Sequence, residues 1–256
     1  MVLTGLTIGC QKVPLTGRSQ LKLVSNSELL PLSFSNYKGV LDTSSVVRTS
    51  GDAQMVQRVG NRLRQAMEQY LNANNLGSRL EGFQWEFNLI QSPQVNAWCM
   101  PGGKIAFYTG ILEQLKLSDD EAAMIMGHEM AHALREHARA RIAKSQGTGT
   151  LLSMGAQLFG LGQLGDVAAN IGTQLLTLRF SREDETDADL VGLELAARGG
   201  FNPQASVSLW EKMGQASGGA GGPAFLSTHP SGPERIRQLQ ANVPKVQGLY
   251  QRAARG

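Results

Sequence analysis

A His-Glu-x-x-His sequence at residues 128–132 constrains this chain more than any other feature. On a helix, residues four apart lie on one face, so His128 and His132 can offer imidazole nitrogens to one zinc ion. Glu129 would then lie beside the open position of the metal. This spacing is typical of metallopeptidases, and it predicts a helix that carries two metal ligands, His128 and His132, and one catalytic carboxylate, Glu129.

The residues around the motif favour a long helix. Ser118 and Glu121 form a capping box, and the run that follows is rich in Ala, Met, Leu, Ile and Glu. We predict one helix from about Ser118 to Lys144. A helix with two incidental histidines is the alternative, and a third ligand elsewhere in the chain argues against it.

A catalytic zinc normally takes three ligands from the protein and leaves the fourth position for water. A third histidine six residues after His132 is excluded, because position 138 is alanine. His137 lies about 180° around a helix from His128, so it cannot reach the same metal. The third ligand must therefore come from another part of the chain.

An acidic cluster at residues 181–189 begins a second helix and offers two Glu-x-x-x-Asp pairs. The face of Glu185 and Asp189 continues through small residues, which allow close approach to the motif helix, whereas the face of Glu183 continues toward a charged residue. We therefore predict Glu185 as the third zinc ligand. Asp189 is predicted to accept the outer N–H of a ligand histidine and to fix its orientation.

The stretch before the motif helix predicts a small antiparallel sheet. Residues 83–90 alternate apolar and polar side chains, which indicates a half-buried strand. Residues 95–100 and 104–108 flank a Pro-Gly-Gly turn, which indicates a hairpin. An edge strand here would pair with an extended peptide, and plain structural support is the alternative. The predicted substrate-binding residues are Asn96, Ala97 and Trp98.

The composition indicates a globular protein of 256 residues, 41% hydrophobic and 18% charged. A net charge of +3 with scattered Lys and Arg residues argues against a nucleic-acid partner. No stretch reaches the length of a membrane-spanning helix. Helical patterns at residues 25–41 and 51–74 predict scaffold helices. Residues 151–178 predict either two short helices that cover the site or a buried hairpin.

The first ten residues are apolar and end in a small residue followed by Cys10, which resembles the end of a bacterial lipoprotein signal. Residues 1–24 are therefore predicted to be a signal remnant, with Cys10 as the lipidation site. A buried N-terminal strand is the alternative. The acylated Cys10 predicts a bacterial periplasmic protein anchored to an envelope membrane. The peptidase domain is predicted at residues 25–242 and a C-terminal tail at 243–256.

Four motifs in order resemble metallopeptidase family forty-eight, which includes the CAAX prenyl proteases, HtpX and mitochondrial Oma. Since no transmembrane helices are present, the chain is similar to the soluble, lipoprotein-like branch of the BepA and LoiP type. The resemblance implies a zincin-like gluzincin fold, α+β and mainly α, with one zinc per chain and a role in quality control of envelope proteins. The motifs are His128-Glu129-x-x-His132, Phe180-Ser-Arg-x-x-Glu185-x-x-Ala-Asp189, Asn96-Ala-x-x-x-Pro-Gly-Gly103 and Thr228-His229-Pro230.

These observations predict a zinc-dependent endopeptidase that hydrolyses unfolded or misassembled envelope proteins, with Glu129 as general base toward the zinc-bound water. The alternative is an envelope chaperone or binding module in which zinc holds two helices together. His229 resembles the histidine that, in the BepA branch, approaches the zinc and blocks the water site. A donor to the oxyanion and a plain loop histidine are the other interpretations of His229.

Overall fold

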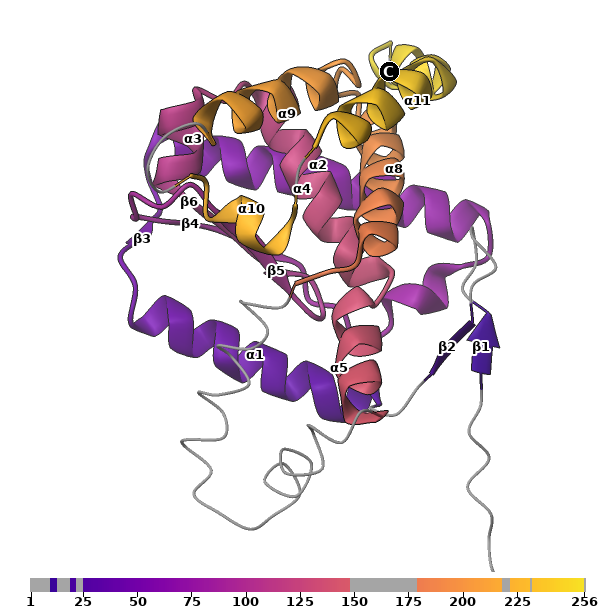
Figure 1. Ribbon diagram of the computed structural model, residues 1–256. Helices are drawn as coiled ribbons and strands as arrows, with labels where there is room; N and C mark the ends of the chain where they lie inside the picture. The colour runs from indigo at the N-terminus through magenta and orange to yellow at the C-terminus, as the bar shows by residue number, and fades with distance from the viewer. Residues whose placement is uncertain are drawn as a thin grey trace, which may run out of the picture.

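The computed structural model describes residues 10–12, 19–21, 25–147, 179–217, 222–230 and 232–255. Helices make up most of this part, and a small four-stranded sheet packs against them (Figure 1). The helices or hairpin predicted at 151–178 lie outside the described residues, as does most of the glycine-rich loop at 218–223. Within the described ranges, no helix is both long enough and apolar enough to cross a membrane.

Helix α4 (Asp119–Leu134) carries the His-Glu-x-x-His motif through the centre of the molecule (Figure 1). The predicted capping box starts it: the Glu121 N–H donates to the Ser118 hydroxyl at 3.2 Å, and the Ser118 N–H donates to the Glu121 carboxylate at 3.0 Å. Every side chain from Glu121 to Leu134 is buried. The motif therefore lies in the core, on a rigid element.

The prediction of one helix from Ser118 to Lys144 is wrong. Helix α4 ends at Leu134, and helix α5 (His137–Gly147) begins after a two-residue break. Glu136 in the break has a φ of 55°, a left-handed conformation that cannot continue a right-handed helix. The bend changes the direction in which His137 points.

The sheet has four strands in the order β3-β4-β6-β5. The predicted hairpin of β5 and β6 forms, and Gly102 and Gly103 in its turn have φ of 84° and 88°, which glycine adopts without steric cost. The sheet is mixed rather than antiparallel, because β4 and β6 pair in parallel. The strands are β3 (Val46–Val47), β4 (Glu86–Ile90), β5 (Ala97–Met100) and β6 (Lys104–Tyr108).

Two helices before the sheet form the predicted scaffold. Helix α2 (Gly51–Ala73) buries an apolar stripe, including Val59, Leu63 and Met67, in the core that it shares with the sheet and α4. Helix α1 (Asn26–Asp42) packs on the other face of the sheet, where Tyr37 contacts β5 and β6. The sheet is thus covered on both faces, and α4 adjoins its β5 edge.

Three helices complete the core. Helix α8 (Arg182–Arg198) crosses α4, and α9 (Ala205–Ala216) and α11 (Pro233–Ala253) pack over them (Figure 1). Helix α11 continues past residue 242, the predicted end of the peptidase domain, and buries Val243 and Val246. The remaining elements are β1 (Cys10–Lys12), β2 (Ser19–Leu21), the 3-10 helix η1 (Gly77–Leu80), α3 (Thr109–Leu115) and α10 (Phe225–Thr228).

The observed architecture confirms the predicted class, α+β and mainly α, with a small sheet beside the motif helix. Cys10 lies in β1, which pairs with β2 in an antiparallel register. The sheet, α4 and α8 together position the side chains of the site.

Candidate metal centre

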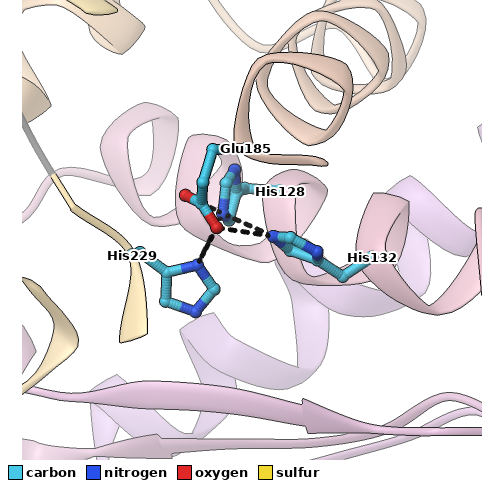
Figure 2. Close-up of side chains that lie close together, drawn as sticks. All are labelled: His128, His132, Glu185 and His229. Atoms are coloured by element: carbon cyan, nitrogen blue, oxygen red, sulfur yellow. Dashed lines mark hydrogen bonds and ion pairs between the residues drawn. The ribbon is translucent and has the colours of Figure 1, made fainter. Parts of the chain in front are cut away.

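The two motif histidines turn toward one point between α4 and α8. Their Nε2 atoms lie 3.0 Å apart. Glu185 of α8 reaches the same point, with one carboxylate oxygen 3.4 Å from His132 Nε2 and the other 3.6 Å from His128 Nε2 (Figure 2). The structure thus brings together the three side chains that were predicted as zinc ligands.

His229 joins this cluster from the end of α10 (Figure 2). Its Nδ1 atom lies 3.0 Å from Glu185 Oε1 and 3.1 Å from His128 Nε2. All four residues of the cluster, His128, His132, Glu185 and His229, are at most 5% exposed. Their ligand atoms all lie within 4.8 Å of one another, so the cluster is able to hold one metal ion.

The donor set fits zinc by distance and by chemistry. A tetrahedral zinc site with bonds of about 2.0–2.1 Å has ligand atoms about 3.3 Å apart, and five of the separations within the cluster lie between 3.0 and 3.6 Å. Burial lowers the pKa of both His128 and His132, which favours the neutral imidazoles that a metal requires. Hydrogen bonds from His132 and His229 outweigh burial and hold the pKa of Glu185 well below its usual range.

Asp189 holds the outer nitrogen of His128, at 2.9 Å from Nδ1. Arg235 of α11 in turn donates to both Asp189 oxygens, at 2.6 and 2.7 Å, and to Glu185 at 2.9 Å. The guanidinium stacks on the Trp210 ring at 3.5 Å, so its orientation is restricted on the remaining side. Although burial raises the pKa of Asp189, Arg235 and His128 lower it, and the carboxylate remains ionised.

Glu129 lies beside β5, where the backbone of Cys99 hydrogen-bonds to its carboxylate. Its Oε1 atom is buried and has no hydrogen-bond partner in the described part of the protein, although His229 Nε2 lies 3.3 Å away. Burial raises the pKa of Glu129 to about 7. A buried carboxylate of this kind can accept a proton near neutral pH and release it again.

Strand β5 runs along the edge of the sheet beside α4. The Tyr108 N–H donates to the Asn96 carbonyl at 3.1 Å, so Ala97 and Cys99 direct their main-chain groups to the other edge. The side chain of Trp98 points away from the cluster and packs edge-on against Tyr37, with ring centroids 5.7 Å apart. Of the predicted substrate-binding residues, Trp98 therefore offers the open edge neither its side chain nor its main-chain groups, which pair with Ala106 of β6.

Sequence reasoning missed two groups around the cluster. Arg235 lies 46 residues beyond Asp189, and no local pattern connects them. His137 lies 2.9 Å from His132 and 3.2 Å from Asp187, because the chain turns back at Glu136. A non-glycine residue rarely adopts the left-handed conformation, so the sequence carried no signal for this turn.

Comparisons with known proteins agree with this geometry. Residues 57–243 match the model for Peptidase family M48. The mitochondrial metalloendopeptidase OMA1 of Schizosaccharomyces pombe is 38% identical over 172 residues, which cover 66% of this chain and 50% of that protein. The OMA1 protein of Arabidopsis thaliana is 40% identical over 65% of this chain and 33% of its own length. Metalloprotease LoiP of Escherichia coli is 27% identical over 66% of both chains.

The chain spans half or less of the length of the two OMA1 relatives named here. Both are mitochondrial proteins of eukaryotes, and they contradict the predicted location in a bacterial periplasm with an anchor at Cys10. That prediction was wrong because it depended only on a short apolar run before one cysteine, a pattern that many chains share.

Proposed function

The chain belongs to peptidase family M48, and from this premise we propose that it is a zinc-dependent endopeptidase that hydrolyses unfolded or misassembled proteins. The observation that carries the proposal is the convergence of His128, His132 and Glu185, with the carboxylate of Glu129 beside them. The relatives named above as metalloendopeptidase and metalloprotease support the reaction class. Envelope substrates are not proposed, since they depended on the corrected location.

In this proposal His128, His132 and Glu185 hold the metal, and Asp189 and Arg235 hold two of those ligands in place. A bound zinc ion supplies Lewis-acid polarisation of the scissile carbonyl and of the attacking water. Glu129 takes the proton of that water and later delivers it to the leaving amine.

The substrate is proposed to lie along β5 as an added strand. Main-chain groups of Ala97 and Cys99 are directed to this edge, and α4 with Glu129 adjoins it. Pairing by main-chain groups is tolerant of side chains but requires an extended peptide. We therefore expect loose sequence preference and a strong preference for unfolded proteins.

His229 is proposed to act as a latch on this site. Its Nδ1 atom occupies the cluster itself, within 3.1 Å of a histidine and of Glu185. The segment that carries it is tied to the substrate edge, because the Phe225 N–H donates to the Val95 carbonyl at 3.0 Å. Withdrawal of His229 would free one ligand position and the strand edge together.

The position of His229 in the cluster also supports the second candidate function, a chaperone or binding module with a closed metal site. A structural zinc site is normally completed by a fourth protein ligand, and His229 is placed to serve as one. The two functions differ in turnover, because a closed site binds unfolded chains without cleaving them.

The test combines metal analysis with cleavage of unfolded casein by the full chain. The wild type should bind one zinc per chain and cleave casein, whereas Glu129→Gln should keep the zinc and lose turnover, since the carboxylate oxygen that accepts the proton is gone. A tightly folded substrate protein with intact disulfides should resist cleavage, whereas the same protein should be cleaved after reduction has unfolded it. The chaperone would be favoured if the zinc-loaded wild type and the zinc-loaded His229→Ala variant both bind casein and neither cleaves it.

A further inference from the structure

His137 is a buried imidazole with both ring nitrogens engaged, and the proposed reaction gives it no part. Its side chain is 2% exposed. Nδ1 lies 2.9 Å from Nδ1 of His132, and Nε2 lies 3.2 Å from Oδ2 of Asp187. His137 thus connects the outer nitrogen of a proposed zinc ligand to a carboxylate on α8.

The far end of this connection is fixed by an ion pair. Arg135 donates to both oxygens of Asp187, from Nε at 2.5 Å and from Nη2 at 3.1 Å. Both side chains are buried, which makes this planar, two-point contact strong and directional. Although burial raises the pKa of Asp187, His137 and Arg135 lower it, so the carboxylate accepts hydrogen bonds only.

The break between α4 and α5 places His137 beside the His132 ring. On an unbroken helix, a residue five positions after His132 lies about 140° away around the axis and cannot meet its ring. The left-handed Glu136 turns the chain back, and Arg139 pairs with Glu136 and donates to Asn26 at 2.7 Å. The helix break therefore serves the contact between the two imidazoles.

Only one arrangement of protons satisfies all these contacts if His132 binds metal through Nε2. The His132 proton must then lie on Nδ1, so His137 must accept it with the lone pair of its own Nδ1. The His137 proton must in turn lie on Nε2, where it donates to Asp187. Every donor thus has an acceptor, and the chain ends on a carboxylate held by Arg135.

We propose that His137 is a positioning residue, which orients His132 and fixes its tautomer by transmitting the Arg135–Asp187 ion pair to the metal site. Helix α8 then supplies a ligand, Glu185, and a carboxylate support for each ligand histidine. Asp189 contacts His128 directly, and Asp187 reaches His132 through His137. Supports of this type typically contribute about 10- to 100-fold in metal affinity.

The proposal rests on the proposed zinc site, and its test measures metal binding rather than turnover. The full chain is loaded with zinc, and release into excess chelator is followed for wild type, His137→Phe and Asp187→Asn. Each substitution should weaken zinc binding about 10- to 100-fold. The visible spectrum of the cobalt(II)-substituted protein should shift in both variants, because the orientation of His132 changes. A purely structural role for His137 would leave this spectrum unchanged.

Two further variants sharpen the test. His137→Asn retains an acceptor near the position of Nδ1 and should bind zinc more tightly than His137→Phe. The double variant His137→Phe/Asp187→Asn should be no weaker than His137→Phe, because the two residues act in series. Arg141→Gln is the matched control, since it alters a half-buried cation of the same helix outside the contacts described above and should leave zinc release unchanged.

Wild-type zinc release and cobalt spectra in both His137→Phe and Asp187→Asn would overturn the proposal. If circular dichroism shows that His137→Phe does not fold, wild-type zinc release and cobalt spectra in both His137→Asn and Asp187→Asn would overturn the proposal. A wild type that binds zinc but cleaves no peptide would contradict the proposed endopeptidase and leave the role of His137 intact.

Discussion

Gly127 of α4 and Gly192 of α8 face each other, backbone to backbone, where the two helices cross. A methyl group on Gly192 would lie 2.7 Å from the backbone nitrogen of His128, and one on Gly127 would lie 2.8 Å from the Gly192 carbonyl oxygen. Neither neighbour is a side chain that could move aside. This close approach allows Glu185, two turns before Gly192, to reach the histidines of α4.

We therefore expect Gly192→Ala to force α4 and α8 apart. The free energy of unfolding should fall by about 1–3 kcal/mol, the usual cost of overpacking, and zinc affinity should fall with it because Glu185 withdraws from His128 and His132. Urea unfolding and chelator competition measure the two effects. Gly214→Ala is the control, because its methyl group meets nothing within 4 Å and should leave both quantities unchanged or slightly improved.

The choice of the third ligand can be tested by replacing the two glutamates at the start of α8 with alanine, one at a time. Glu185→Ala should lower zinc content strongly, because it removes the one carboxylate ligand of the four-residue cluster. Glu183→Ala should keep it, since Glu183 is exposed and lies outside the cluster. Zinc content after dialysis is the measurement. The reverse result would show that the register of α8 in the metal site is wrong.

His229→Ala distinguishes a latch from a transition-state donor. As a latch, His229 competes for a position in the cluster, so its removal should raise cleavage of unfolded casein several-fold while zinc stays bound by the other three side chains. As a donor to the oxyanion, its removal should lower kcat by about 100- to 1000-fold. Steady-state kinetics with matched zinc content decides between them. Unchanged activity and zinc affinity would leave His229 as a loop residue with neither role.

The capping carboxylate of α4 predicts a pH dependence of stability. Burial raises the pKa of Glu121, but hydrogen bonds from Lys212 at 2.7 Å, from Ser118 and from Ser208 outweigh it and lower the pKa. A lowered pKa in the folded state stabilises the protein above the unfolded value of about 4.3, and this contribution is lost as pH falls through the folded pKa. Urea unfolding should show stability falling as the pH drops below about 5.

Glu121→Gln should flatten this part of the profile, because an amide does not titrate. Its stability should lie below that of the wild type at pH 7, and the gap should narrow as the pH falls. Ser208→Ala removes one of the hydrogen bonds to Glu121 and should give an intermediate slope. A wild-type slope in Glu121→Gln would show that other carboxylates govern acid stability.

Local patterns were enough to predict most elements and much of the site. Helical spacing predicted α1, α2 and the start of α4, and alternation with a Pro-Gly-Gly turn predicted the hairpin of β5 and β6. The two motif histidines lie four residues apart on one helix, so their shared face follows from helix geometry alone. Glu185 and Asp189 could be selected because the small residues that continue their face indicate where α8 meets α4.

Other features required contacts between distant residues. The parallel pairing of β4 with β6 depends on how the chain passes around the hairpin, and α11 continues beyond residue 242 because Val243 and Val246 find a core to cover. The parallel pairing has no local signal. Leu239, Val243 and Val246 recur at helical spacing, but the core that buries them comes from helices distant in the sequence.

The sequence by itself determined that two histidines and a carboxylate share one helix, and that an acidic helix could supply the third ligand. Only the tertiary structure decided what surrounds them: Arg235 behind Asp189, and His137 turned back onto His132. The physical reason is the sequence distance over which each kind of interaction acts. Helix periodicity acts over a few residues, whereas a buried charge is satisfied by whichever partner the packing of distant helices brings within hydrogen-bond distance.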